Sequence, residues 1–171
     1  MNAFEAEIQR SCIALDLYYR KLPVPSKIGT ANGKTYLIKL DKTPFDGFIV
    51  YGGRFVPLEM KSQVLFGSFP LSNIEEHQII GLKKMIDLGC VPYLLINQRR
   101  VEKEGKKVSR NRAWAIDFRD WDALIPQLKG RKSIPAEFFE NGCNGLLTEI
   151  PRIHAFHLGK TELVWDIRIL V

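Results

Sequence analysis

Residues 91–97 (VPYLLIN) restrict the fold of this chain most strongly, because their side chains are apolar at consecutive positions rather than at alternate ones. A strand that is covered on both faces needs such a run, so we expect a central strand of a buried sheet here. Helical patterns over residues 74–88 and 120–128 flank this strand. The alternation of helices and strands predicts an α/β fold with a mixed β-sheet flanked by helices.

The rest of the chain supplies further elements of the same kind. We expect an amphipathic helix over residues 3–20, ended by a proline-containing segment, and a turn over residues 29–33. Strands are expected over residues 35–40, 45–50, 55–61 and 113–118. The glycines of residues 51–54 indicate a hairpin turn between the second and third of these strands.

Composition limits the class of protein. The chain has 171 residues and no internal repeat, which predicts one domain over residues 1–171. No apolar run is long enough to span a bilayer and no signal peptide is present, so we expect a cytoplasmic protein that does not enter a membrane. Three widely spaced cysteines and three scattered histidines do not indicate a zinc site. The formal net charge of +6 is compatible with a polyanionic partner.

The predicted hairpin carries two acids and a lysine at positions where they would meet. Asp46 begins the first strand, and Glu59 lies near the end of the second, roughly opposite Asp46. Glu59 and Lys61 are two residues apart, so both side chains leave the same face of the sheet. We therefore expect Asp46, Glu59 and Lys61 to converge on one spot.

Such a cluster suits the hydrolysis of a phosphodiester. Two carboxylates can bind Mg²⁺ or Mn²⁺, which polarises a phosphate oxygen and lowers the pKa of a bound water. A neighbouring lysine can position the attacking water and offset charge on the phosphate. The alternative is a surface salt bridge, which the apolar residues around Glu59 make less fitting.

Several motifs resemble the RecU family of Holliday junction resolvases, within the PD-(D/E)xK nuclease superfamily. They lie in both halves of the chain: the first helix with Glu5, Glu7 and Tyr18-Tyr19, the proline exit at residues 21–25, Asp46-Gly47, Glu59-Met-Lys61, residues 68–74 (SFPLSNI) with Glu76-His-Gln78, residues 130–134 (GRKSI), and Pro151-Arg152. The resemblance implies a restriction-endonuclease-like core and a metal-dependent endonuclease. It also implies cleavage of four-way DNA junctions by two symmetric nicks, and hence a homodimer.

The resemblance also assigns supporting residues to the site. A third metal carboxylate often comes from the first helix in this superfamily; Glu5 lies closer to the apolar face of that helix than Glu7 and fits the family pattern better. A solvent-facing glutamate is the alternative for both, and more so for Glu7. Gln78, in a helix capped by Ser72 or Asn73, would contact the water or the scissile phosphate.

Basic residues outside the hairpin are candidates for contacts with DNA. Residues 99–112 hold seven basic residues and two acids, and we expect them to form a basic loop between two strands. The predicted phosphate contacts are Thr43, Arg99, Arg100, Lys106, Lys107, Arg110, Arg131, Lys132 and Arg152. A solvated charged loop and, for Thr43, a turn hydroxyl are the alternatives.

Two departures from the family bear on substrate choice. Residues 26–43 are shorter than the stalk segment of the family, and we expect the basic N-terminal arm of the family to be missing, because the first helix is expected to begin at residue 3. These departures predict weaker selectivity for junctions. The competing functions are a less selective PD-(D/E)xK nuclease on branched or linear DNA, and a non-catalytic DNA-binding module, which would not need an intact Asp46, Glu59 and Lys61.

Overall fold

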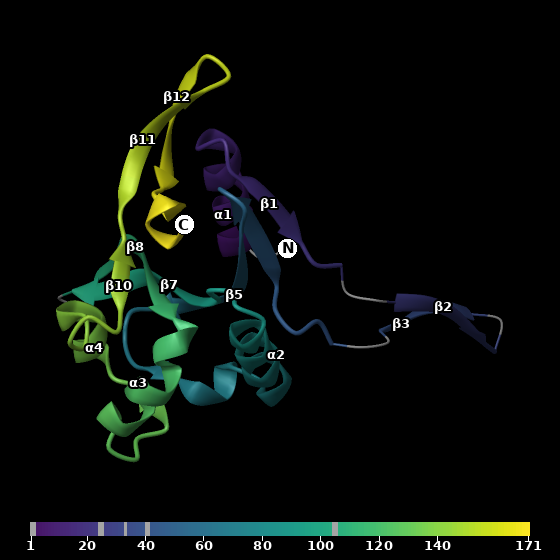
Figure 1. Ribbon diagram of the computed structural model, residues 1–171, viewed down its shortest axis with the longest axis horizontal. Helices are drawn as coiled ribbons and strands as arrows, with labels where there is room; N and C mark the ends of the chain where they lie inside the picture. Colours follow the sequence, from purple (N-terminus) through teal and green to yellow (C-terminus); the bar gives the residue numbers. More distant parts are fainter. Residues whose placement is uncertain (1–2, 24–25, 33, 40–41, 104–105) are drawn as a thin grey trace.

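A six-stranded mixed sheet forms the centre of the molecule (Figure 1). The computed structural model describes residues 3–23, 26–32, 34–39, 42–103 and 106–171. The sheet order is β1-β4-β5-β7-β8-β10. Its strands are β1 (Tyr18–Lys21), β4 (Gly47–Tyr51), β5 (Arg54–Leu65), β7 (Tyr93–Lys103), β8 (Lys106–Asp117) and β10 (Thr148–Ile150). Strands β5 and β7 run parallel, and the other neighbouring pairs run antiparallel.

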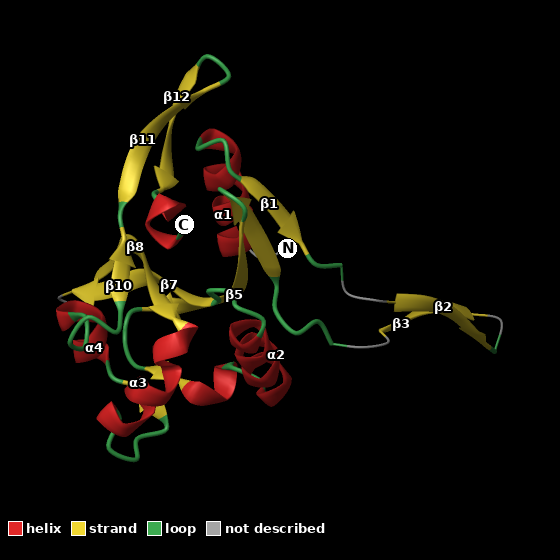
Figure 2. Cartoon of the chain, viewed as in Figure 1, coloured by secondary structure: helices red, strands yellow, loops and turns green. Residues whose placement is uncertain are grey.

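Helices cover both faces of the sheet (Figure 2). One face packs against α1 (Ala3–Ala14) and the 3-10 helix η3 (Ile167–Leu170), and the other against α2 (Glu76–Asp87), α3 (Trp121–Gln127) and α4 (Ala136–Asn141). In β7, Leu94 and Ile96 join the core on the α2 side, whereas Leu95 joins the core on the α1 side. The predicted α/β fold, with a central strand buried on both faces, is confirmed.

Three two-stranded sheets complete the described part of the chain. The β2–β3 hairpin extends to the right in Figure 1, and the β11–β12 hairpin extends upward. Their bounds are β2 (Ser26–Ala31), β3 (Lys34–Lys39), β11 (Arg152–His157) and β12 (Lys160–Trp165). The third pair is β6 (Phe69–Pro70) with β9 (Ser133–Ile134), and two 3-10 helices are η1 (Leu71–Asn73) and η2 (Phe118–Asp120). None of the described helices has the length and apolarity needed to cross a membrane.

The first helix is shorter than its apolar spacing predicts. It ends at Ala14, and Asp16 adopts a left-handed conformation with φ of 55°. The chain then enters β1, in which Tyr19 pairs with Ile49 of β4. Aromatic residues favour strands, and pairing with β4 gives their backbone groups hydrogen bonds, so the tertiary pairing overrides the helical spacing of residues 15–20.

The predicted basic loop is also wrong, because residues 99–103 and 106–112 continue β7 and β8. Val101 pairs with Val108, so β-branched residues stand opposite each other in the extension. The turn predicted over residues 29–33 begins too early, because residues 29–31 belong to β2, where Gly29 pairs with Tyr36. The sequence motifs also include Pro25, Gly33, Leu40 and Glu104, which lie outside the described residues.

Candidate active site

The β4–β5 hairpin places Asp46 beside Glu59. Asp46 lies one residue before β4, and the pair Gly47–Leu58 fixes the register. The Asp46 backbone N–H donates to the Leu58 carbonyl at 3.0 Å, and the Met60 N–H donates to Asp46 Oδ2 at 2.8 Å. The backbone of β5 therefore holds both the main chain and the carboxylate of Asp46 across from Glu59.

Glu59 is almost fully buried, with 1% of its surface exposed, and only one of its carboxylate oxygens is satisfied. Its Oε1 lies 2.8 Å from Lys61 Nζ and accepts a hydrogen bond from Gln78 Nε2 at 2.6 Å. Its Oε2 is buried with no hydrogen-bond partner among the described residues. A buried carboxylate oxygen without a donor is costly, so this position calls for a cation or a proton.

Both acids bind a proton more tightly than they would in water. Burial, and then the charge of Asp46, raise the pKa of Glu59 to about 7. Burial also raises the pKa of Asp46 above its ordinary value; the nearby charge of Glu5 adds to this, and the hydrogen bond from Met60 opposes it. Carboxylates with these shifts are the kind that a divalent cation deprotonates and binds.

Helix α2 supplies Gln78 to the site. The Gln78 side chain is buried, and its Oε1 accepts from Lys61 Nζ at 2.9 Å and from the backbone N–H of Glu75 at 2.9 Å. Gln78 thus links Lys61 and Glu59 while it caps its own helix. The N-cap is Glu75. The prediction of Ser72 or Asn73 as the cap is wrong, because both lie in η1, where Leu71 and Ile74 instead form the turn that precedes α2.

Gly81 lets α2 approach the segment that precedes the β4–β5 hairpin. A Cβ at Gly81 would lie 2.5 Å from the Cβ of Pro44 and 2.8 Å from its carbonyl oxygen. Only a residue without a side chain fits at this distance from the segment that leads to Asp46. The close contact between helix and segment fixes the position of Gln78 relative to Asp46.

Glu5 lies on α1 at the border of the site. It is buried, with 7% of its surface exposed, and it forms an ion pair with Lys21 of β1. Its charge contributes to the raised pKa of Asp46, which places the two acids within electrostatic range. In the described part of the chain, no three His, Cys, Asp or Glu side chains form a complete ligand group. Asp46 and Glu59 are the candidate carboxylate pair, and Glu5, paired with Lys21, lies at the border of the site.

Glu7 is not solvent-facing, contrary to the alternative considered from the sequence. Its carboxylate accepts hydrogen bonds from Trp165 Nε1 at 3.0 Å and Asn111 Nδ2 at 3.1 Å, and it contacts Arg99 at 3.2 Å. These partners come from β12, β8 and β7. Glu7 joins α1 to three strands, which gives it a structural role.

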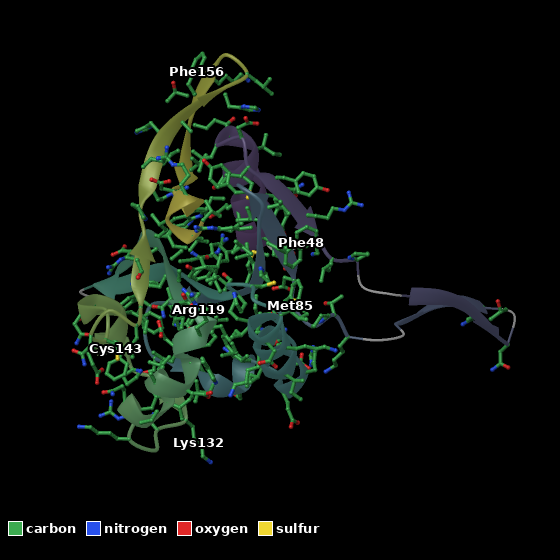
Figure 3. All side chains as sticks on the ribbon, in the orientation of Figure 1. Phe48, Met85, Arg119, Lys132, Cys143 and Phe156 are labelled. Carbon is green, nitrogen blue, oxygen red and sulfur yellow. The ribbon has the colours of Figure 1, made fainter. Side chains whose placement is uncertain are left out.

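The predicted DNA-contact residues are spread over the molecule. The side chain of Arg99 is engaged by Glu7 and by Ser62 at 3.3 Å, and Arg131 pairs with Glu137 at 2.9 Å. The guanidinium of Arg152 lies 4.7 Å from the ring centre of Trp165 at the base of the β11–β12 hairpin. Figure 3 shows Lys132 at the opposite end of the molecule from Phe156, which marks the tip of that hairpin.

The other predicted DNA contacts are Thr43 and four basic residues of the β7–β8 hairpin. Thr43 is half-buried in the segment before Asp46. Arg100, Lys106, Lys107 and Arg110 lie on the β7–β8 hairpin, and their side chains fall outside the described part of the structure.

Two residues near the site were not predicted from the sequence. Lys21 and Tyr19 are two apart on β1, so their side chains leave the same face of that strand. Their only sequence signal is that spacing, and it becomes informative once residues 18–21 are known to form a strand. The prediction of a helix through residue 20 concealed it.

The chemistry of the donors fits a hard divalent cation. Two carboxylates from adjacent strands offer oxygen ligands, and Glu59 Oε2 lacks any other partner among the described residues. Mg²⁺ and Mn²⁺ prefer such ligands and retain several waters when one or two carboxylates bind them. The ammonium group of Lys61 pairs with the other oxygen of this carboxylate, Oε1.

Curated relatives of the chain share one name. The chain is 30% identical over 124 residues to the Holliday junction resolvase RecU of Pediococcus pentosaceus, a match that covers 70% of this chain and 55% of the relative. RecU of Oceanobacillus iheyensis is 26% identical over 121 residues, or 68% of this chain and 55% of the relative. RecU of Lactococcus lactis subsp. lactis is 25% identical over 134 residues, which cover 78% of this chain and 58% of the relative.

These matches bear on the predicted family and fold. The chain spans a little over half the length of the curated relatives that it matches. No family model matches the chain. The relatives and the mixed sheet flanked by helices confirm the predicted resemblance to RecU and the predicted restriction-endonuclease-like fold class.

Proposed function

This chain is RecU-like in sequence over about 70% of its length, and from that relationship we propose that it is a divalent-metal-dependent DNA endonuclease that resolves Holliday junctions. The observation that carries the proposal is the pair of half-buried Asp46 and buried Glu59, with one oxygen of Glu59 unpartnered among the described residues and the other bound by Lys61 and Gln78. A protein that only binds DNA has no need for a carboxylate pair that repels phosphate.

Each residue of the cluster has a distinct role in this proposal. Asp46 and Glu59 hold Mg²⁺ or Mn²⁺, with Glu5 as the third carboxylate. When bound, the cation supplies Lewis-acid activation of the phosphate and of a water. Lys61 positions the attacking water and offsets charge that builds on the phosphate. Gln78 keeps Lys61 and Glu59 oriented through its two hydrogen bonds and reaches the water or the scissile phosphate.

The wider proposal concerns the whole protein. We propose that residues 1–171 form a single nuclease domain and that two copies form a homodimer, because resolution needs two symmetric nicks. Thr43, the β7–β8 hairpin, Arg131, Lys132 and Arg152 are the proposed contacts with DNA phosphates. The formal net charge of +6 supports a polyanionic partner.

Cleavage of defined DNA substrates tests this function. A four-way junction and a linear duplex of the same sequence are incubated with the protein in Mg²⁺, in Mn²⁺ and in EDTA. We expect paired nicks in the junction with either metal and no cleavage in EDTA. Equal cleavage of both substrates would favour the less selective nuclease, and binding without cleavage in either metal would favour the non-catalytic module.

A further inference from the structure

A tyrosine hydroxyl beside the carboxylates has no role in the proposal so far. Tyr19 lies on β1, and its hydroxyl is buried with no hydrogen-bond partner among the described residues. An unsatisfied buried hydroxyl destabilises a fold, and most such groups in proteins have a partner. Phenylalanine would fill the same space without this cost, so the hydroxyl itself needs an explanation.

The hydroxyl lies against the residue that follows Asp46. A Cβ at Gly47 would be 2.8 Å from Tyr19 Oη and 2.8 Å from the carbonyl oxygen of Arg20. Gly47 therefore leaves the space that the hydroxyl occupies. In the β1–β4 register Gly47 pairs with Lys21, whose ammonium group pairs with Glu5. The hydroxyl is thus placed where α1, β1 and β4 come together at the carboxylates.

The electrostatic surroundings keep this hydroxyl protonated. Burial raises the pKa of Tyr19 above its ordinary value, and the charges of Glu5 and Asp46 raise it further. A neutral tyrosine can donate a hydrogen bond, and the nearby carboxylates can accept one. The Tyr19 hydroxyl lies within electrostatic range of Glu5 and Asp46, yet in this structure no hydrogen bond joins it to any described residue.

We propose that Tyr19 is a positioning residue of the metal centre, whose hydroxyl donates a hydrogen bond to a carboxylate oxygen of Glu5 or Asp46 when these residues hold the divalent cation. The inference rests on the proposed function, since it requires that the carboxylates bind a metal. Hydrogen bonds to metal ligands fix the orientation of the ligands and increase metal affinity. Tyr19 acts through the ligands and touches neither DNA nor the reacting phosphate.

The test compares Tyr19→Phe with Tyr18→Phe. Tyr18 is the adjacent residue of the same strand, but it is 60% exposed and its ring is tilted against that of Phe48, so losing its hydroxyl should change little. Binding of Mn²⁺ to wild type and both variants is measured by calorimetry and by the electron paramagnetic resonance signal of free Mn²⁺. We expect about 10- to 100-fold weaker binding by Tyr19→Phe, the usual loss for a removed partner of a metal ligand, and wild-type binding by Tyr18→Phe.

Thermal unfolding in EDTA separates this role from a structural one. Without metal the hydroxyl is unsatisfied, so Tyr19→Phe should melt at or above the wild-type temperature, and Mn²⁺ should raise its melting temperature less than that of wild type. Unchanged Mn²⁺ affinity, or a lower melting temperature in EDTA, would overturn the proposal for Tyr19 alone. A wild-type protein that binds no Mn²⁺ would overturn the metal centre itself and the role of Tyr19 with it.

Discussion

Glu59 is held in a state that only a proton or a cation can satisfy. Its side chain is 1% exposed, Lys61 and Gln78 bind one oxygen, and the other oxygen has no hydrogen-bond partner among the described residues. Burying a carboxylate is expensive when one of its oxygens has no partner, and a second carboxylate nearby increases that cost. A fold that retains this arrangement gains from it only when a cation binds, which makes the pair the most informative target for substitution.

Removing either charge should abolish cleavage. Asp46→Asn and Glu59→Gln keep the size of each side chain and remove a metal ligand, so we expect cleavage of a four-way junction to fall about 100-fold or more, since even the loss of an outer partner of a metal ligand costs about 10- to 100-fold. Junction binding in EDTA should be equal or tighter, because less negative charge repels the phosphate. Lys61→Ala should also lower cleavage, with a smaller effect on metal affinity.

Glu76→Gln is the matched control for these substitutions, because Glu76 is an exposed acid at the start of α2. It should cleave at the wild-type rate. Wild-type cleavage by Asp46→Asn or Glu59→Gln would show that the active site lies elsewhere.

The metal-free protein should be less stable at neutral pH than at acid pH. The pKa of Glu59 rises from 4.5 to about 7 on folding, so the folded state binds the proton more tightly than the unfolded state. Stability from this group is therefore complete below pH 4.5 and is lost as the pH rises from 4.5 towards 7. The difference between the two pKa values corresponds to roughly 3 kcal/mol. The raised pKa of Asp46 acts in the same direction.

Urea unfolding in EDTA at pH 5 and pH 8 measures this effect. Wild type should be more stable at pH 5, and Glu59→Gln should lose most of the difference because glutamine does not titrate. If the variant keeps the full difference, other groups cause it and the raised pKa of Glu59 is wrong.

At the scale of elements, the site depends on how closely α2 lies against the segment before β4. Gly81 and Pro44 are in direct contact, and a Cβ at Gly81 would lie 2.5 Å from the Cβ of Pro44. Gly81→Ala should therefore move α2 away and destabilise the protein by about 1–3 kcal/mol. That loss outweighs the gain of about 1 kcal/mol in helix propensity. Cleavage should fall as well, since Gln78 moves with the helix.

Gly67→Ala is the control for this substitution, because nothing lies within 4 Å of a Cβ at Gly67. Denaturant unfolding and junction cleavage compare the two variants. Equal stability of both would show that α2 does not need the close contact with Pro44.

The elements that the sequence predicted correctly are those with local signals. The β4–β5 hairpin has a glycine turn and a short loop, so its register and the meeting of Asp46, Glu59 and Lys61 follow from nearby residues. Elements after residue 128 were not predicted, and some of the contacts that place them are distant in sequence. The Trp165 N–H, for example, donates to Ser11 Oγ across 154 positions, and no periodicity records such a contact.

The β7–β8 hairpin turns a run of charge into an extended element. Its backbone pairing continues to Lys103 and Lys106, beyond the last contact of β5 with β7 at Leu65–Arg100. A basic two-stranded arm that leaves the sheet can follow a DNA backbone. Replacing Lys106, Lys107 and Arg110 with alanine should weaken binding to all DNA shapes and reduce the slope of log affinity against log salt by about 2–3, since each lost phosphate contact removes about 0.9.

A charge-matched variant controls for the change in net charge: alanine at Lys84, Lys129 and Lys160, none of which is a predicted DNA contact. Fluorescence anisotropy over a range of salt concentrations gives both slopes. The same slope in wild type and in the hairpin variant would mean that the basic arm serves only solubility.

At the scale of the whole molecule, two hairpins extend away from the sheet in different directions, β2–β3 and β11–β12 (Figure 1). The tip of β11–β12 exposes Phe156 and Leu158 to 74% and 87%. One catalytic pair makes one nick, so productive resolution of a four-way junction requires a second copy.

We therefore expect a homodimer in solution that prefers junctions only moderately. Residues 26–31 and 34–39 form a paired hairpin, but the segment is shorter than the stalk of the family that it resembles. A shorter element would enter the centre of a junction less deeply, so the preference for four-way over simpler branched DNA should be smaller than in relatives with a longer stalk.

Analytical ultracentrifugation at micromolar concentration, with and without DNA, measures whether the protein is a dimer. Competition between labelled junction and unlabelled duplex measures the preference for junctions. A protein that stays monomeric on and off DNA could not place two active sites on exchanging strands, and that result would replace the resolvase with a general nuclease; a dimer that binds duplex and junction equally would retain the assembly and remove the selectivity.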